Sequence, residues 1–136
     1  MQNLEIVGIV NAYMAKKKQD AKDRKEGVYV DEMKLPAAVA WKRRVNMDKL
    51  FKAKALIDDA MKELGEKYAD DEHSVEGENG VRRVKEEYLP EYLKAQGEIL
   101  AQDTELDIRK VKIEDLGEIE LSDSDMDTIG FMIEGE

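Results

Sequence analysis

Four acidic residues near the C-terminal end have the spacing of a calcium-binding loop. Asp123, Asp125, Asp127 and Glu134 stand at positions 1, 3, 5 and 12 of the EF-hand pattern. The pattern fails at its sixth position, because Thr128 stands where a glycine must make the sharp turn. The other interpretation is a helix N-terminus rich in aspartate, whose carboxylates favour the positive end of the helix dipole. We therefore expect a capped helix here and no metal site.

The single histidine, His73, stands in a polar stretch beside Asp70, Asp71 and Glu72. A histidine among carboxylates can hold a metal ion or act as a general base. However, no serine nucleophile at a diagnostic spacing and no glycine-rich phosphate loop accompany it. The chain also lacks cysteine, which excludes disulfides, thiolate metal sites and a cysteine nucleophile. We expect a solvated loop, no cofactor and no enzymatic activity.

A basic turn, Lys42-Arg43-Arg44, follows Trp41 and is the strongest candidate for a binding patch. A nucleic-acid reader would combine such a patch with other positive surface, whereas the net charge of −10 opposes a polyanion at long range. Nucleic acid is therefore an unlikely partner, and we expect the turn to contact acidic residues 114–127 within the fold. The candidate partner-binding residues are Trp41, Arg43, Arg44, Asp123, Asp125 and Asp127.

Charge is distributed unevenly along the chain. Residues 1–55 carry a net charge of +6, and residues 56–136 carry −16. Such asymmetry indicates either an electrostatic match within the fold or two surfaces of opposite sign. We expect the first, in which basic helices neutralise the acidic end.

Hydrophobic periodicity predicts two helices in the first half of the chain. Apolar residues at helical spacing predict a helix over residues 3–26, and Gly27 is a plausible end for it. A second, long helix over residues 35–69 starts at Pro36 and carries a coiled-coil-like seam. The seam consists of Met47, Leu50, Lys54, Ile57, Met61, Leu64 and Tyr68. Between the helices, the β-prone run 28–30 is either a short strand or an extended connector.

The second half mixes helical and extended patterns. After a polar loop over residues 70–80, residues 81–102 have a helical stripe that Pro90 should kink or divide. We expect the seam to pair with residues 81–99 in an antiparallel helical hairpin, while pairing with a second copy remains the alternative. Alternation of apolar and charged residues predicts a β-hairpin over residues 105–121. Ser122 has the character of an N-cap for a last helix over residues 122–134.

These elements predict an α+β fold that is predominantly helical: antiparallel long helices, a small β-hairpin and a short C-terminal helix. The length of 136 residues is that of a single domain, residues 1–136. No segment reaches the roughly 20 apolar residues that span a bilayer, so no membrane contact is expected. The order of charges at the start does not fit a secretory signal, and a cytoplasmic location is expected.

The order of three pieces resembles a known group of proteins. They are the turn from Leu35 to Met47 that leads into the long helix, the Lys67-Tyr68 pair, and the ending from Glu105 to Leu121 followed by residues 131–134. Together they are similar to small uncharacterised proteins of tailed phages and prophages from Gram-positive hosts. The resemblance covers residues 35–136 and carries no assigned activity. It implies a phage product that meets virion components or host machinery.

Two functions follow as hypotheses. The first is a non-enzymatic interaction protein, an accessory factor in phage assembly whose partner is a virion component or a host protein. The second is an inhibitor of a host defence protein, in which the acidic surface of residues 98–136 imitates nucleic-acid phosphates. Self-association through the seam is a further possibility.

Overall fold

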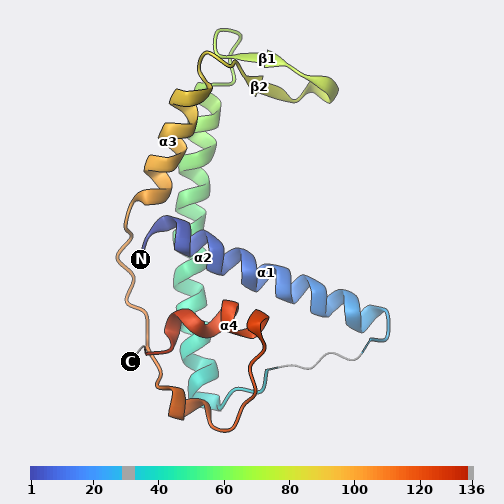
Figure 1. The fold of residues 1–136 in the computed structure, drawn as a ribbon, viewed down its shortest axis with the longest axis vertical. Coiled ribbons are helices and arrows are strands. Elements are labelled where there is room, and N and C mark those ends of the chain that lie inside the picture. The colour runs from blue at the N-terminus through green and yellow to red at the C-terminus, as the bar shows by residue number, and fades with distance from the viewer. Residues whose placement is uncertain (29–32, 135–136) are drawn as a thin grey trace.

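The computed structural model describes residues 1–28 and 33–134 (Figure 1). Within these ranges, the helices are α1 (Asn3–Lys25), α2 (Ala37–Lys67), α3 (Leu89–Ala101) and α4 (Asp123–Ile129). Strands β1 (Ser74–Glu76) and β2 (Arg82–Val84) pair antiparallel. Short 3-10 turns are η1 (Glu78–Gly80), η2 (Ile113–Leu116) and η3 (Gly130–Met132). The predicted helical α+β fold, with a small β-hairpin and a short C-terminal helix, is confirmed.

Helix α2 is the axis against which the other elements lie (Figure 1). Its 31 residues span about 46 Å at 1.5 Å per residue. Helix α3 runs antiparallel along the C-terminal half of α2, so the predicted helical hairpin is confirmed. Helix α1 crosses α2 near its middle, and α4 lies alongside α1 (Figure 1).

The buried side chains of helix α1 lie in its first turns. Its buried residues are Asn3, Ile6 and Val10. The remainder of α1 extends beyond α2 (Figure 1), and it carries most of the basic residues of this helix. The apolar stripe in the sequence stops after residue 15, in agreement with the position of this part of α1 outside the hydrophobic clusters.

Two hydrophobic clusters hold the helices together. The first joins α1 to α2 and contains Ile6, Val10, Met47, Leu50, Ala53 and Ile57. The second joins the start of α2 to the C-terminal region and contains Val39, Val111, Leu116, Ile129 and Met132. Ile108 and Phe131 pack against both clusters, so the two cores are continuous at these side chains.

The β-hairpin predicted over residues 105–121 is wrong. This segment runs extended along α2 and contains only a single-residue parallel bridge, Val111 with Ile133, and the turn η2. Its alternation has a different cause, because Leu106, Ile108 and Val111 pack into the hydrophobic clusters. An extended segment that packs on a helix shows the same two-residue period as a strand.

The hairpin of the structure lies elsewhere, in β1 and β2. Glu76 pairs with Arg82 across a loop in which Asn79 has φ 61° and Gly80 has φ 75°. Positive φ at both positions is typical of Asn-Gly turns. The helix predicted over residues 81–102 is therefore wrong for its first part. Helix α3 begins at Leu89, with Pro90 in its first turn where proline costs no hydrogen bond, so Pro90 starts the helix and does not kink it.

The other predicted boundaries agree with the structure to within a few residues. The expected helices over residues 3–26 and 35–69 correspond to α1 and α2. The helix expected over residues 122–134 is shorter, because α4 gives way to the turn η3 at Gly130. Of the β-prone run 28–30, residues 29 and 30 lie outside the described residues.

Candidate functional site

A cleft of about 440 Å³ lies between α1, α2 and α4. Most of its walls are polar and come from helices far apart in the sequence. The lining residues are Tyr13, Lys16, Lys17, Asp20 and Arg24 of α1, Met33, Arg43 of α2, and Asp125 and Thr128 of α4. The cleft exists because α1 extends past α2 while α4 packs beside it (Figure 1).

Arg43 is the most constrained cation of this cleft. Its Nη2 donates a hydrogen bond of 3.3 Å to Thr128 Oγ1, and its guanidinium lies 5.1 Å from the centre of the Tyr13 ring. Its Nε is buried without a hydrogen-bond partner among the described residues. Burial lowers the pKa of Arg43, while the charges of Tyr13 and Asp125 act in the opposite direction. No carboxylate of the described residues forms an ion pair with this guanidinium.

Tyr13 holds the cationic wall in place. Lys17 Nζ lies 4.8 Å from its ring centre, so the ring contacts two cations. The Phe51 ring packs edge-on against it, with centroids 5.7 Å apart. Cation–π contacts of this kind contribute about 0.5–1 kcal/mol each at exposed positions. They orient Lys17 and Arg43 without neutralising their charge.

The cleft continues into a second hollow of about 900 Å³ along α2. Both share Tyr13, Lys17, Met33 and Arg43, and we call the combined depression the α1–α2 groove. The second part adds cations and an apolar floor. Its further lining residues are Lys34, Leu35, Ala40, Arg44, Met47, Asp48 and Phe51.

The acidic residues of the α1–α2 groove are already engaged. Asp20 pairs with Lys16 at 3.5 Å, and Asp48 pairs with Lys52 at 2.9 Å. Asp125 accepts a hydrogen bond of 3.2 Å from the N–H of Ser122 in the capping box of α4. The groove is therefore a cationic site in a chain whose net charge is −10.

The structure brings together only some of the six predicted partner-binding residues. Arg43 and Asp125 line one cleft, and Arg44 lines its continuation. Trp41 is 60 % exposed. It is not among the residues that line the cleft or its continuation. Asp123 and Asp127 are exposed on α4.

The four acidic residues with EF-hand spacing do not form a loop. Asp123, Asp125 and Asp127 belong to α4, whose N-cap is Ser122. Ser122 Oγ accepts from the N–H of Asp125 at 3.2 Å, and the Asp125 carboxylate caps Ser122 in return. The spacing is thus that of a capped helix start, as the aspartate-rich interpretation predicts.

The expected neutralisation of the acidic end by the basic helices is small. Among the described residues, Lys49 with Asp107 at 3.9 Å is the one ion pair that joins residues 1–55 to residues 103–134. Lys42 and Lys49 also donate to backbone carbonyls of the extended segment. The acidic side chains from Asp103 to Glu134 are exposed, with Asp125 the partly buried exception. The acidic surface is consequently open to solvent.

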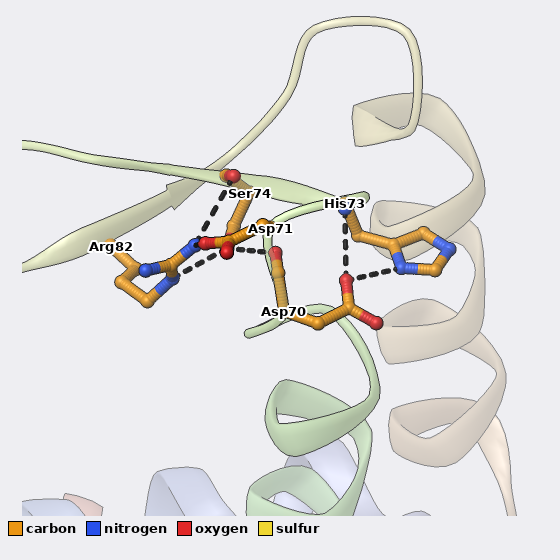
Figure 2. A network of polar contacts seen from close by, with 5 residues as sticks. All are labelled: Asp70, Asp71, His73, Ser74 and Arg82. Atoms are coloured by element: carbon orange, nitrogen blue, oxygen red, sulfur yellow. Dashed lines mark hydrogen bonds and ion pairs between the residues drawn. The ribbon is translucent and has the colours of Figure 1, made fainter.

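A second polar cluster lies where α2 ends and β1 begins (Figure 2). The Asp70 carboxylate accepts from the backbone N–H of His73 at 2.9 Å and lies 2.6 Å from its Nδ1. Arg82 donates to Asp71 at 2.7 Å and to Ser74 Oγ at 2.8 Å. The hydrogen bond to the His73 side chain is the main cause that lowers the pKa of Asp70.

The hydrogen bonds of this second polar cluster join the loop after α2 to the β1–β2 hairpin, and we call the cluster the clamp. Ser74 Oγ donates to the Asp70 carbonyl at 2.7 Å and not to His73, so no serine is activated there. The His73 ring packs against Tyr68 and Tyr88, with centroids 5.4 Å and 4.6 Å away. Asp70, Glu72 and His73 each offer a ligand atom within 4.8 Å of the others, but they are exposed or only partly buried.

Helix α3 leaves an apolar face uncovered. Tyr92 and Ile99 face the other helices, through the Tyr68 ring and the first cluster respectively. Leu89 and Leu93, which are 38 % and 54 % exposed, lie outside both clusters. By helical spacing they share a face with Leu100, and the small residues Pro90, Gly97 and Ala101 flank it. We call this set the α3 apolar face.

Among the groove residues that sequence reasoning missed are Tyr13, Lys17 and Thr128, which make the contacts around Arg43. Tyr13 and Lys17 are four residues apart on a helix, which places them on one side of it. That spacing was a usable signal for a cation–aromatic pair. The contact of Thr128 with Arg43 spans 85 positions, and nothing in the local sequence indicates it.

In comparisons with protein-family models, curated proteins and solved structures, no family, relative or structural neighbour matches this chain. Within the described ranges, none of the helices is long and apolar enough to cross a membrane.

Proposed function

We propose that this protein is a non-enzymatic interaction protein that binds a protein partner through the α3 apolar face. The observation that carries this proposal is the uncovered pair Leu89 and Leu93, 38 % and 54 % exposed on a helix with no fully buried residue. The charged residues of α3, namely Glu91, Lys94 and Glu98, are all at positions that face away from this pair. A partner would therefore meet an apolar surface without desolvating a charge.

The total surface supports the same proposal. The accessible area is 9854 Å². A compact protein of this mass exposes about 7,200 Å². The protruding α1 and the exposed leucines of α3 contribute to this excess. Proteins that expose contiguous apolar surface commonly use it for association.

The partner is best described as a different protein. Two copies would bring together two chains with a net charge of −10 each, and this repulsion opposes self-association. With the resemblance to small phage proteins, the proposed role is an accessory factor in phage assembly, acting on a virion component or host protein in the host cytoplasm.

A matched pair of variants tests this role. Leu89→Gln/Leu93→Gln replaces the two exposed leucines of the apolar face with glutamine. Lys94→Gln/Glu98→Gln introduces two glutamines on the charged side of α3 and is the control. A partner captured from infected cells should bind wild-type and control protein alike and bind the leucine variant at least about tenfold more weakly. Equal binding by both variants contradicts the proposal, as does a purified protein that sediments as a dimer through this face.

One observation favours a second function. Apart from Asp125, the carboxylates from Asp103 to Glu134 are exposed, and Asp107 is the one among them with an ion pair to another described residue. An inhibitor that imitates nucleic-acid phosphates needs such an unneutralised surface. Binding of that kind should collapse between low and moderate salt, whereas binding through the α3 apolar face should change little.

A further inference from the structure

We propose that the α1–α2 groove is a second docking site, which receives an acidic and partly apolar segment of a protein partner. This site extends the proposed interaction function to a surface that the α3 apolar face does not include. In this groove, four cations that form no ion pair with the described residues, Lys17, Lys34, Arg43 and Arg44, border a continuous hollow.

The charge of the groove argues for an acidic occupant. Its lining contains six basic side chains, Lys16, Lys17, Arg24, Lys34, Arg43 and Arg44, and three acidic ones, Asp20, Asp48 and Asp125. Two of the acids are paired with lysines, and the third caps α4. Lys17, Lys34, Arg43 and Arg44 form no ion pair with any residue of the described ranges. Each can therefore accept a carboxylate ligand.

The floor of the groove argues that the occupant is also apolar. Met33, Leu35, Met47 and Phe51 line it beside the cations. Phe51 is 37 % exposed although its ring packs on Tyr13. A free inorganic anion would leave this apolar surface uncovered, whereas a peptide with alternating acidic and apolar side chains would use both parts.

The position of α4 argues against a nucleic-acid duplex in the same groove. Asp125 forms part of the wall, and Asp123 and Asp127 are exposed on the same helix. Duplex DNA carries one charge per about 1.7 Å along its axis, so part of it would lie against these carboxylates. A short segment with a few carboxylates can place them on Lys34, Arg43 and Arg44 and avoid α4.

The geometry of Arg43 makes it the centre of this site. Its single hydrogen bond to Thr128 is long, at 3.3 Å, and the Tyr13 ring orients the guanidinium. A partly buried guanidinium forms stronger hydrogen bonds with a carboxylate than one in water does. Arg43 is thus positioned before the partner arrives, which lowers the entropic cost of binding.

The test measures by fluorescence polarisation how a short labelled peptide that contains Glu, Asp, Leu and Phe binds the protein. Its neutral counterpart has Gln in place of Glu and Asn in place of Asp. The acidic peptide should bind the whole protein at low salt, and the neutral counterpart should not. Lys34→Glu/Arg44→Glu changes two exposed lining residues without touching the core, and it should weaken binding by at least about tenfold. Lys62→Glu/Lys94→Glu makes the same charge change outside the groove and should leave affinity within about twofold.

The remaining arms separate this inference from its alternatives. Leu89→Gln/Leu93→Gln should bind the peptide like wild type, since the α3 apolar face is a different surface. Equal binding of the neutral peptide, or equal loss in the two charge variants, overturns the inference. Full displacement of the peptide by inorganic phosphate would show a simple anion site, and tighter binding of a DNA duplex would show a nucleic-acid site; either result also overturns it.

Discussion

The side chain of Asn46 forms two hydrogen bonds with the backbone of Arg109, 63 residues later in the chain. Its Nδ2 donates to the Arg109 carbonyl at 2.9 Å, and its Oδ1 accepts from the Arg109 N–H at 2.8 Å. Asn46 is completely buried. Its side chain therefore forms the pair of backbone hydrogen bonds that a neighbouring strand would form. These bonds connect the extended segment to α2.

Replacing this amide should destabilise the fold. Asn46→Ala leaves both backbone groups of Arg109 without this partner, and we expect the free energy of unfolding to fall by about 1–3 kcal/mol. Urea denaturation followed by circular dichroism measures the change. Asn11→Ala is the control, because Asn11 is exposed on α1. An equal effect at both positions would contradict the role of Asn46.

Two leucines on α2 give a direct test of the core. Leu50 is fully buried in the first cluster, whereas Leu56 is 71 % exposed. Leu50→Ala should lower the free energy of unfolding by about 2–5 kcal/mol, through lost burial and a residual cavity. Leu56→Ala deletes the same atoms and should change it by less than about 0.5 kcal/mol. A reversed order would mean that α2 packs with its other side.

The extended segment shows what a sequence pattern can and cannot establish. Alternation of Leu106, Ile108 and Val111 with polar residues correctly indicates extended chain. It cannot indicate what lies beside that chain, because a strand and a helix surface select the same alternation. Here the neighbour is α2 with Asn46, and Val111 meets the C-terminal end through N–H and carbonyl bonds of 2.8 Å to Met132 and Glu134.

The β1–β2 hairpin was not predicted because its strands are short. Each strand has three residues and carries charged side chains, so no apolar alternation flanks the turn. The Asn79-Gly80 dipeptide was visible as a turn. Val81 and Val84, however, continued the helical stripe of α3 in phase, which extended the predicted helix by eight residues, from Leu89 back to Val81.

Part of the lining of the α1–α2 groove was identified from the sequence. Arg43, Arg44 and Asp125 were identified from local charge and capping patterns, and the structure places all three in its lining. Trp41 was included through its neighbours alone, and it is not among the lining residues. The remaining lining depends on how α1 crosses α2, which is a property of long-range packing.

The N-cap of α4 should contribute measurably to stability. Ser122→Ala removes the acceptor for the N–H of Asp125, which lies 3.2 Å from Ser122 Oγ. A lost N-cap costs about 1 kcal/mol, and because Thr128 lies on α4, its contact with Arg43 should loosen as well. Denaturation curves measure this loss. Ser124 Oγ lies 3.1 Å from Ser122 Oγ. Ser124→Ala therefore removes a neighbour of the cap but not its acceptor, and it should cost less than Ser122→Ala.

Asp70 should make the stability of the clamp depend on pH. Its pKa in the folded protein lies below the ordinary value of about 3.9, chiefly because His73 donates to its carboxylate. A group with a lowered folded pKa contributes stability above its unfolded pKa, and that contribution disappears as the pH falls through the folded pKa.

The comparison of wild type with Asp70→Asn measures this contribution. The difference in the free energy of unfolding should shrink as the pH falls below about pH 4. Asp59→Asn, which makes the same change at an exposed position on α2, is the control. An NMR titration of the Asp70 carboxyl with a midpoint above about 3.9 would show that the sign is wrong.

Two glycines should respond in opposite directions to a single added methyl group. At Gly77, a Cβ would lie 2.8 Å from the Val81 carbonyl oxygen, to which the Gly77 N–H donates at 2.7 Å. Gly77→Ala should therefore displace the β1–β2 loop at a cost of about 1–3 kcal/mol. At Gly97, nothing lies within 4 Å of a new Cβ, and Gly97→Ala in α3 should add about 0.5–1 kcal/mol to the free energy of unfolding.

Because a short hairpin can open without global unfolding, hydrogen exchange of the residue-77 amide is the sensitive readout. Faster exchange in the Gly77→Ala variant, together with a higher melting temperature in Gly97→Ala, is expected; unchanged exchange at residue 77 would mean that the loop does not adopt this geometry.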